Sequence, residues 1–323
     1  MTELRPSLAA LEEAADLVHR FMPPTPQFVW PLLDRRVGAE VWVKHENHTA
    51  VGAFKVRGGL AYFDVLRRRH PGLPGTIAAT RGNHGQSVAF AAARAGVPAT
   101  IVVPLGNSRE KNAAMRALGA TLVEHGHDFQ AALERSREIA AERGLHFVPS
   151  FAPELVRGVA SYALELFRAA PPLDRVYVPI GLGSGICGVL AARDALGLTT
   201  EVVGVCAEGA PAYALSFAAG RPVATGSADT MADGMACRIP VPEAVEAIVR
   251  GAARVVTVSD TEIRSAMRAL FSDTHNVAEG AGAASLAAAL RESAVNAGKR
   301  IALVLSGGNV DRDVFASVLA GED

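Results

Sequence analysis

Lys55 is the residue of this chain best placed to do chemistry. It follows a turn of small residues, Gly52 and Ala53, and stands directly after Phe54 at the start of a predicted helix. The amino end of a helix presents unpaired N–H groups, which suit a phosphate or a carboxylate. A lysine amine in such a place can form a Schiff base with an aldehyde. The alternative is an ordinary surface lysine on a helix, and the surrounding glycines weigh against it.

Three other segments combine glycines with polar side chains. Residues 80–86, TRGNHGQ, lie where a predicted strand meets a helix, and Arg81, Asn83 and the backbone N–H groups there could hold an anion such as a carboxylate. Residues 181–188, GLGSGICG, lie in the same kind of position and would let a phosphate approach the backbone closely. Residues 306–309, SGGN, place the Ser306 hydroxyl at the end of the last predicted strand. Each segment, taken alone, is also compatible with a plain turn.

The glycine loop at 181–188 is not typical of a nucleotide site. No acidic residue closes the following strand to hold a ribose, and the loop lacks the GK[ST] ending of a nucleoside-triphosphate loop. A lysine for a Schiff base, an anion loop, a single-phosphate loop and a strand-end hydroxyl together suit a ligand with an aldehyde, a phosphate and a heteroaromatic nitrogen. That ligand is pyridoxal 5′-phosphate.

Short apolar runs alternate with amphipathic stretches, which predicts an α/β fold of two lobes, each an open, mostly parallel twisted sheet flanked by helices. The predicted strands are Thr76–Ala79, Ala99–Val103, Ala120–Glu124, Arg175–Pro179, Glu201–Cys206, Val255–Val258 and Arg300–Ser306. The predicted helices are Gln86–Ala95, Arg109–Leu118, Asp128–Arg143, Gly188–Leu196, Asp260–Phe271 and Ala283–Ala297. Residues 221–242 read as a long irregular loop, and such loops tend to be functional. We expect a large domain of residues 1–51 and 153–323 and a small domain of residues 52–152.

Composition narrows the partners. The formal net charge of -1 provides no basic field for nucleic acid or an anionic membrane, so a small-molecule partner is expected. No run approaches the roughly 20 apolar residues that span a bilayer. The three cysteines, Cys187, Cys206 and Cys237, form no CxxC pair, which favours a soluble, cytoplasmic protein without a disulfide framework.

The chain resembles the threonine/serine dehydratase (ammonia-lyase) group of the fold-type II, tryptophan synthase β-like, pyridoxal-phosphate enzymes. The resemblance covers nearly the whole chain and is closest to a branch linked to hydroxyectoine breakdown. Its markers, in the family's order, are KHENHTAVGAFKVRGG at 44–59, TRGNHGQS at 80–87, GLGSG at 181–185, ADGMA at 232–236, AEGAGAAS at 278–285 and SGGN at 306–309.

The resemblance implies a role for each marker. Lys55 would carry the cofactor as a Schiff base and later move the Cα proton. The other implied cofactor contacts are Phe54, Asn83 at the 3′-oxygen, Gly181, Leu182, Gly183, Ser184 and Gly185 at the phosphate, Ser306 at the pyridine nitrogen, and Gly234 and Glu279 beside the cofactor. The implied substrate-carboxylate contacts are Thr80, Arg81, Gly82 and His84. A homodimer is implied by the family alone.

Three features depart from the family pattern. Arg81 stands where relatives have a small residue or a serine base; because arginine is a poor base at neutral pH, little racemase activity is expected. Arginine suits a carboxylate, so Arg81 could bind a second carboxylate on the substrate. The alternative is that Arg81 only braces its loop. Cys206 takes the place of an acid of the family's divalent-cation site, with Glu208 two residues later, so we predict no metal. The chain ends at Asp323, so no C-terminal regulatory domain is expected.

The predicted activity is a dehydratase that converts a threonine- or serine-like β-hydroxy amino acid into a 2-keto acid and ammonia. The substrates that stay open are threonine, serine, phenylserine, 3-hydroxyaspartate and an intermediate of a hydroxyectoine-type pathway. One alternative is β-replacement, as in cysteine synthases of the same fold. Another is a binding protein that keeps the fold without chemistry, against which Lys55, Asn83 and Ser306 argue.

Overall fold

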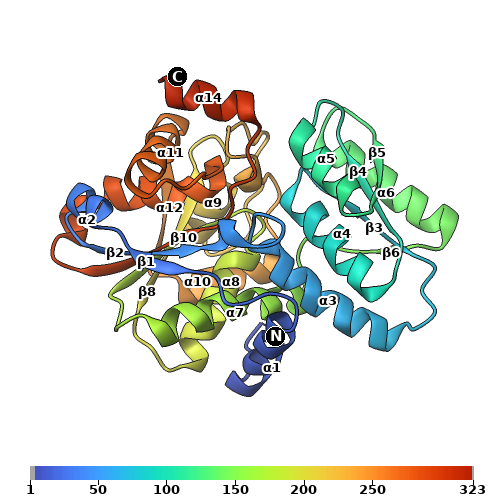
Figure 1. The fold of residues 1–323 in the computed structure, drawn as a ribbon, viewed down its shortest axis with the longest axis horizontal. Coiled ribbons are helices and arrows are strands. Elements are labelled where there is room, and N and C mark those ends of the chain that lie inside the picture. The colour runs from blue at the N-terminus through green and yellow to red at the C-terminus, as the bar shows by residue number, and fades with distance from the viewer. Residues whose placement is uncertain (1–3, 322–323) are drawn as a thin grey trace.

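Two β-sheets divide the protein into a large lobe and a small lobe (Figure 1). The computed structural model describes residues 4–321. The sheet of the large lobe has the order β1 (Gln27–Val29), β2 (Glu40–His45), β10 (Arg300–Leu305), β7 (Arg175–Pro179), β8 (Glu201–Ala207), β9 (Arg254–Val258). The sheet of the small lobe has the order β5 (Thr121–Glu124), β4 (Ala99–Val103), β3 (Thr76–Ala79), β6 (His146–Phe147). Every pairing is parallel except β1 with β2, so the predicted fold class is confirmed.

Helices pack against both sheets. Those of the small lobe are α3 (Lys55–Arg69), α4 (Asn83–Ala95), α5 (Arg109–Ala117) and α6 (Phe129–Arg143). Those of the large lobe are α1 (Leu8–His19), α2 (Pro31–Val37), α7 (Pro153–Ala169), α8 (Ser184–Ala195), α9 (Ala212–Ala219), α10 (Pro242–Gly251), α11 (Asp260–Thr274), α12 (Gly280–Arg291), α13 (Ser293–Asn296) and α14 (Arg312–Ala320), with short 3-10 turns η1 (Glu46–His48) and η2 (Asp233–Met235). The predicted domain boundaries at residues 52 and 152 stay a prediction.

The apolar runs became strands because helices cover both faces of the central ones. Along β7 and β10 nearly every residue is buried, as in a parallel sheet covered on both sides. The segment 221–242 is irregular apart from η2 and the start of α10, as predicted.

Two predicted helix starts were wrong. α4 begins at Asn83 instead of Gln86, and α8 begins at Ser184 instead of Gly188. Glycines in the first turns suggested loops, but they permit close packing: a Cβ on Gly85 would lie 2.5 Å from the sulfur of Met115. The predicted helix Ala283–Ala297 is in fact two, α12 and α13.

The carboxyl ends of the strands meet where the two lobes face each other. The backbone N–H of Phe54 donates to the carbonyl of Ser306 at 3.0 Å, and Ala53 pairs with Gly307 in an isolated antiparallel bridge. Asn309 donates from Nδ2 to the carbonyl of Val51 at 2.8 Å. These bonds hold the start of α3 against the end of β10, so residues of both lobes share one edge.

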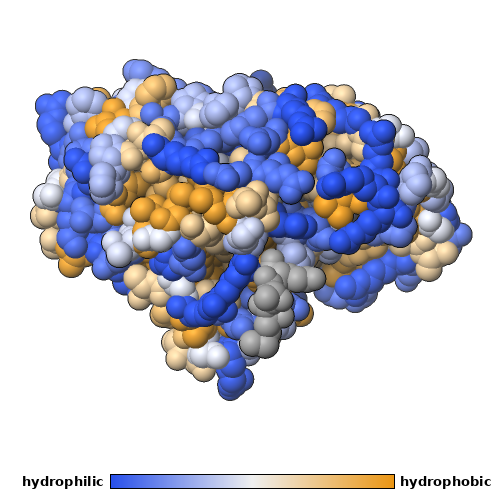
Figure 2. Space-filling model, turned by 90° about the horizontal axis from the view of Figure 1, so that it is seen from below, coloured by the Kyte–Doolittle hydropathy of each residue, from blue (hydrophilic) through white to orange (hydrophobic). Residues whose placement is uncertain are grey.

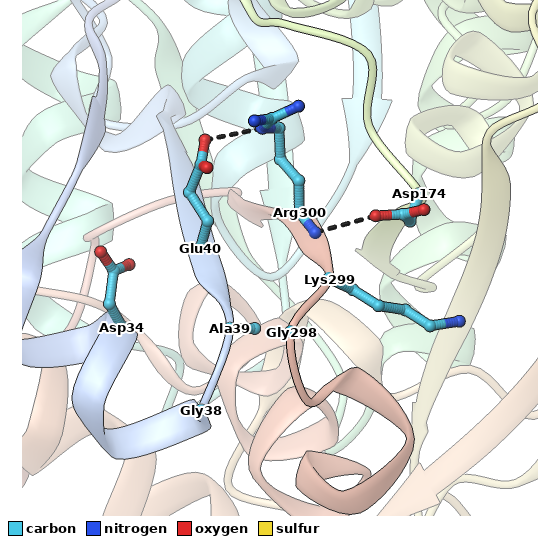
Figure 3. Close-up of a pocket in the computed structure, with 8 residues that line it drawn as sticks. All are labelled: Asp34, Gly38, Ala39, Glu40, Asp174, Gly298, Lys299 and Arg300. Carbon is cyan, nitrogen blue, oxygen red and sulfur yellow. Dashed lines mark hydrogen bonds and ion pairs between the residues drawn. The ribbon is translucent and has the colours of Figure 1, made fainter.

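The opposite ends of the same strands carry a surface hollow of about 540 Å³ (Figure 3). Arg300 spans it, donating from Nε to Glu40 at 2.7 Å and from its backbone N–H to Asp174 at 2.9 Å. Because this hollow lies at the amino ends of β2 and β10, it is separate from the edge that carries Ser306.

The surface is mostly hydrophilic on the face shown in Figure 2, with separate hydrophobic patches on both lobes. Apolar atoms make up more than half of a typical protein surface, so such patches are ordinary. No helix in residues 4–321 is long and apolar enough to cross a membrane.

Candidate active site

The amine of Lys55 lies between the two lobes. Lys55 is the first residue of α3, and its Nζ donates to Ser184 Oγ at 2.8 Å across 129 residues of sequence. The same Nζ lies 4.9 Å from the centroid of the Phe54 ring. Burial lowers the pKa of Lys55 to about 8, so near neutral pH more of the amine is unprotonated than in an exposed lysine. An unprotonated amine can act as a nucleophile or a base.

Contacts on both sides hold the start of α3 in place. Ser87 Oγ donates to the carbonyl of Lys55 at 2.6 Å. The Phe54 ring meets Tyr162 edge to face, with centroids 6.1 Å apart, and the Tyr162 hydroxyl donates to the carbonyl of Gly185 at 3.1 Å. Sequence reasoning missed Tyr162, because nothing distinguishes one aromatic residue on an amphipathic helix from core packing.

The glycine loop after β7 is tightly enclosed. A Cβ on Gly181 would lie 2.2 Å from the carbonyl oxygen of Gly234, which is also a predicted cofactor contact. Gly183 has φ +95°, a conformation that favours glycine. The Tyr213 hydroxyl donates to the carbonyl of Leu182 at 2.9 Å. The loop therefore enters α8 with its backbone fixed, as an anion-binding helix amino end requires.

The loop after β3 is organised by its threonine. Thr80 Oγ1 accepts hydrogen bonds from the backbone N–H groups of Gly82, at 3.0 Å, and Gly85, at 3.3 Å. Thr80 therefore shapes the loop, and a direct contact with substrate is not needed to explain it. Arg81 is exposed, with no ion pair or side-chain hydrogen bond to any residue in 4–321.

His84 is buried in the first turn of α4. Its Nε2 has no hydrogen-bond partner in the described part of the chain. Burial, together with the nearby positive charge of Lys55, lowers the pKa of His84 to about 3, so the ring is neutral at physiological pH. A buried polar nitrogen without a partner is costly, and it is a good candidate for contact with a ligand.

Asn83 is held by residues from the large lobe. Its Nδ2 donates to Glu279 Oε1 at 2.6 Å, and its Oδ1 accepts from Asn309 Nδ2 at 2.8 Å. Burial raises the pKa of Glu279 to about 7, although the charge of Lys111 opposes the rise. Lys111 Nζ lies 3.4 Å from Glu279 Oε2. Lys111 and Asn309 were missed as site residues, although Asn309 ends the SGGN motif.

Ser306 is buried at the end of β10. Its carbonyl accepts from Phe54, as described above, while its hydroxyl has no hydrogen bond within residues 4–321. Next to it, a Cβ on Gly307 would lie 2.6 Å from Glu279 Oε1, so glycine is needed for the close approach. The structure thus brings Lys55, Ser184, Asn83, Glu279 and the end of β10 to one place.

Cys206 and Glu208, at the position considered for a divalent cation, are not arranged as metal ligands. Cys206 is buried and burial raises its pKa to about 12, so it is a neutral thiol and a poor metal ligand. Glu208 accepts instead from Arg291 at 3.0 Å, and the same Arg291 nitrogen also donates to the carbonyl of Thr257 at 2.9 Å. Within the described residues, no three His, Cys, Asp or Glu side chains cluster as metal ligands would.

Known proteins resemble this chain over most of its length. A family model described as "Pyridoxal-phosphate dependent enzyme" matches residues 18–307. The chain is 34% identical to an L-threonine ammonia-lyase of Thermotoga maritima over 89% of this chain and 72% of that protein. It is 33% identical to an L-threo-3-hydroxyaspartate ammonia-lyase of Pseudomonas sp over 96% of this chain and 97% of that one.

Solved structures have the same fold. The processed form of threonine deaminase isoform 2 from Solanum lycopersicum is 27% identical, with a TM-score of 0.87 over 98% of this chain and 95% of that one. A maize serine racemase is 27% identical, with a TM-score of 0.90 over 98% of each chain.

Proposed function

Because the chain belongs to the pyridoxal-phosphate-dependent enzyme family, we propose that it is an ammonia-lyase acting on a β-hydroxy amino acid. The products are a 2-keto acid and ammonia, released after α,β-elimination of water. The observation that carries the proposal is the contact of the Lys55 amine with Ser184 at the glycine loop, which joins a nucleophile to a phosphate-binding helix end. The two relatives named above are ammonia-lyases, which favours this reaction over β-replacement and over a protein without activity.

The residues present fit pyridoxal phosphate. The enclosed glycine backbone at 181–185 suits its phosphate, and the unpartnered His84 nitrogen and Ser306 hydroxyl offer polar contacts. The residues that would hold the cofactor are Lys55, Phe54, Asn83, Gly181, Leu182, Gly183, Ser184, Gly185, Gly234, Glu279 and Ser306. When bound, the cofactor supplies an aldehyde for amines and a ring that draws electron density from Cα.

Lys55 would do the proton transfers. Its amine, with a pKa lowered to about 8, would take the proton from Cα of the bound substrate. Ser184 orients this amine through their hydrogen bond. Ser306 would meet the ring nitrogen with a neutral hydroxyl, which provides no negative charge to hold a proton there. Gly82, His84 and Arg81 would surround the substrate carboxylate, on the loop that Thr80 shapes.

The substrate could carry a second carboxylate, as in 3-hydroxyaspartate. The exposed guanidinium of Arg81 has no partner in the described chain and is shaped for a carboxylate. The hydroxyaspartate relatives from Pseudomonas sp and Saccharomyces cerevisiae also match almost end to end, over 97% and 98% of their lengths. Both observations favour this substrate beside threonine and serine.

A panel assay tests the proposed reaction. Purified protein with pyridoxal phosphate would be given threonine, serine, phenylserine and threo-3-hydroxyaspartate, with and without an added thiol. We expect equal amounts of keto acid and ammonia from at least one of them, unaffected by thiol. A thiol adduct in place of keto acid would support β-replacement, and no product from any substrate would overturn the proposal.

Arg81→Ala tests the second carboxylate. We expect kcat/KM for 3-hydroxyaspartate to fall about 10- to 100-fold, as loss of one charged hydrogen bond implies, with threonine little affected. The two specificity constants would be measured side by side, with Arg109→Ala, another exposed arginine, as the control. An equal loss on both substrates would mean that Arg81 only braces its loop.

Gly181→Ala tests the phosphate loop. Because a Cβ there would lie 2.2 Å from the Gly234 carbonyl oxygen, the loop must move, and we expect the Kd for pyridoxal phosphate to rise at least about 10-fold. The Kd would be measured by titrating apoprotein and following absorbance. Gly226→Ala is the matched control, because a Cβ at Gly226 meets nothing within 4 Å. Unchanged affinity in Gly181→Ala would argue against this loop as the phosphate site.

We also propose a cytoplasmic homodimer. The cysteines Cys187, Cys206 and Cys237 are buried and free, which suits a reducing compartment. Sedimentation of the holoenzyme at several concentrations would test the dimer.

A further inference from the structure

Lys111 connects the two lobes through its amine. It lies on α5 of the small lobe, its side chain is only 6% exposed, and Nζ donates to Asp233 Oδ2 of the large lobe at 2.6 Å. The same nitrogen lies 3.4 Å from Glu279 Oε2. The stem runs beneath the loop after β3, because a Cβ on Gly82 would lie 2.4 Å from Lys111 Cδ. One buried cation thus contacts the substrate loop and two acidic residues of the other lobe.

Glu279 needs this cation to stay an acceptor. The carboxylate is buried, with Asp233 nearby as a second negative charge, and both effects favour its protonated form. The groups that face it are Lys111 on α5, Asp233 on η2, Asn83 on α4 and the backbone of Gly307 after β10. Of these, only Lys111 carries a positive charge. Conversely, Glu279 and Asp233 outweigh burial and raise the pKa of Lys111, which keeps it protonated.

The orientation of the Asn83 amide depends on Glu279. Glu279 Oε1 accepts from Asn83 Nδ2, and Asn309 donates to Asn83 Oδ1, so the two partners define which end of the amide is nitrogen. A protonated Glu279 has one O–H that donates, so the Asn83 amide would no longer face a group that can only accept. Asn83 Nδ2 has two N–H groups, and one of them donates to Glu279. If that bond is not fixed, the direction of the other N–H group is not fixed either.

We propose that Lys111 is a positioning residue that favours the ionised form of Glu279 and thereby fixes the Asn83 amide for contact with the cofactor. The proposal rests on the proposed function only in placing Asn83 beside pyridoxal phosphate. Its main readout is cofactor affinity, which requires no turnover.

The test compares the pH dependence of pyridoxal-phosphate binding in the wild type and four variants. In the wild type we expect the affinity to show a transition near pH 7 that belongs to Glu279 and is absent in Glu279→Gln. In Lys111→Met we expect this transition to move to higher pH by at least one unit. Between the wild-type and the shifted transition, the variant should bind about 10-fold more weakly than the wild type. Lys111→Arg keeps the charge and restores the wild-type profile. In the double variant Lys111→Met/Glu279→Gln, no Glu279 transition is left to move.

Arg109→Met is the matched control. Arg109 is on the same helix and forms an ion pair with Asp313 of the large lobe at 2.8 Å, without contacting Glu279. If Lys111 only ties the lobes together, the two variants will weaken binding alike with no shift in pH, and the proposal is overturned. It is also overturned if the transition stays at the same pH in Lys111→Met, or if Lys111→Arg behaves like Lys111→Met. If the wild type binds cofactor but forms no keto acid, the proposed reaction fails, and the binding titration still decides the role of Lys111.

Discussion

Replacing Lys55 by alanine is expected to lower the rate of keto-acid formation by about 10³-fold or more. In the proposed function the amine both holds the cofactor and moves a proton. Loss of acid–base catalysis alone lowers a reaction rate about 10²- to 10⁴-fold. Its partners Ser184 and Phe54 cannot replace it, since neither is basic. The rate would be measured on the best substrate of the panel. The absorbance band of bound cofactor at about 410 nm should disappear in the same variant.

Two controls separate chemistry from folding. Lys299→Ala removes a lysine at the opposite ends of the strands, beside the hollow of Figure 3, and should leave both rate and absorbance unchanged. Adding a small primary amine to Lys55→Ala should restore part of the rate, because the amine can reach the vacated space. A Lys55→Ala enzyme with full activity and an unchanged absorbance band would remove the basis of the proposed function.

Replacing Arg57 by methionine is expected to lower the free energy of unfolding by about 3–5 kcal/mol. Arg57 is completely buried on α3, and its guanidinium bonds Glu46 at 2.7 and 2.9 Å and Glu165 at 2.5 and 2.9 Å. Without it, Glu46 would accept from the Thr25 hydroxyl, while Glu165 would keep Lys44 at 2.6 Å and His19 at 2.8 Å, and the guanidinium charge between them would be lost. The change would be measured by urea unfolding at pH 7.

The control for Arg57 is an exposed pair on the same helix. Arg68→Met removes the ion pair with Asp64 and should cost less than about 1 kcal/mol, because both side chains are solvated. Adding Glu46→Gln to Arg57→Met should recover part of the loss, since one uncompensated charge is removed. Equal effects of Arg57→Met and Arg68→Met would show that the buried cluster does not stabilise the fold.

Acid should weaken the same cluster. Burial favours the neutral form of Glu165, but Arg57 outweighs it and lowers the pKa to about 2. A lowered pKa means that the ionised group stabilises the fold above its ordinary pKa near 4.5, and that this contribution is lost as pH falls toward 2. The unfolding free energy of the wild type should therefore decrease over this range more steeply than that of Arg57→Met/Glu165→Gln.

The sequence was sufficient for seven of the ten strands in residues 4–321, since β1, β2 and β6 lie outside the predicted runs, and for a lysine at the start of a helix. β3, β4 and β7 are bounded as predicted, because each is a short apolar run followed by a loop rich in glycine, proline or polar residues. Lys55 at a helix start follows from the small residues before it. The starts of α4 and α8 could not be found in this way, because glycines that serve packing look the same as glycines that serve turns.

The contacts around Glu279 were beyond a reading of one sequence. Lys111 and Asp233 are 122 residues apart, and Asn83 and Glu279 are 196 apart, so no local pattern links them. Lys111 lies on a polar helix, where a lysine is ordinarily exposed. Its burial depends on how the two lobes meet, which neither periodicity nor composition encodes.

The position of β10 determines when the protein can assemble. All four strands of the small sheet lie between residues 76 and 147, so this lobe can form early, while the ribosome is still adding residues. In the large sheet, β10 lies between β2 and β7, although it is the last strand to be made. Until residues 300–305 emerge, β2 and β7 have open edges that can pair with other chains. A messenger RNA truncated before the codons for residues 300–305 should therefore yield aggregated protein. Ser306 and Phe54 can pair only at the very end of synthesis.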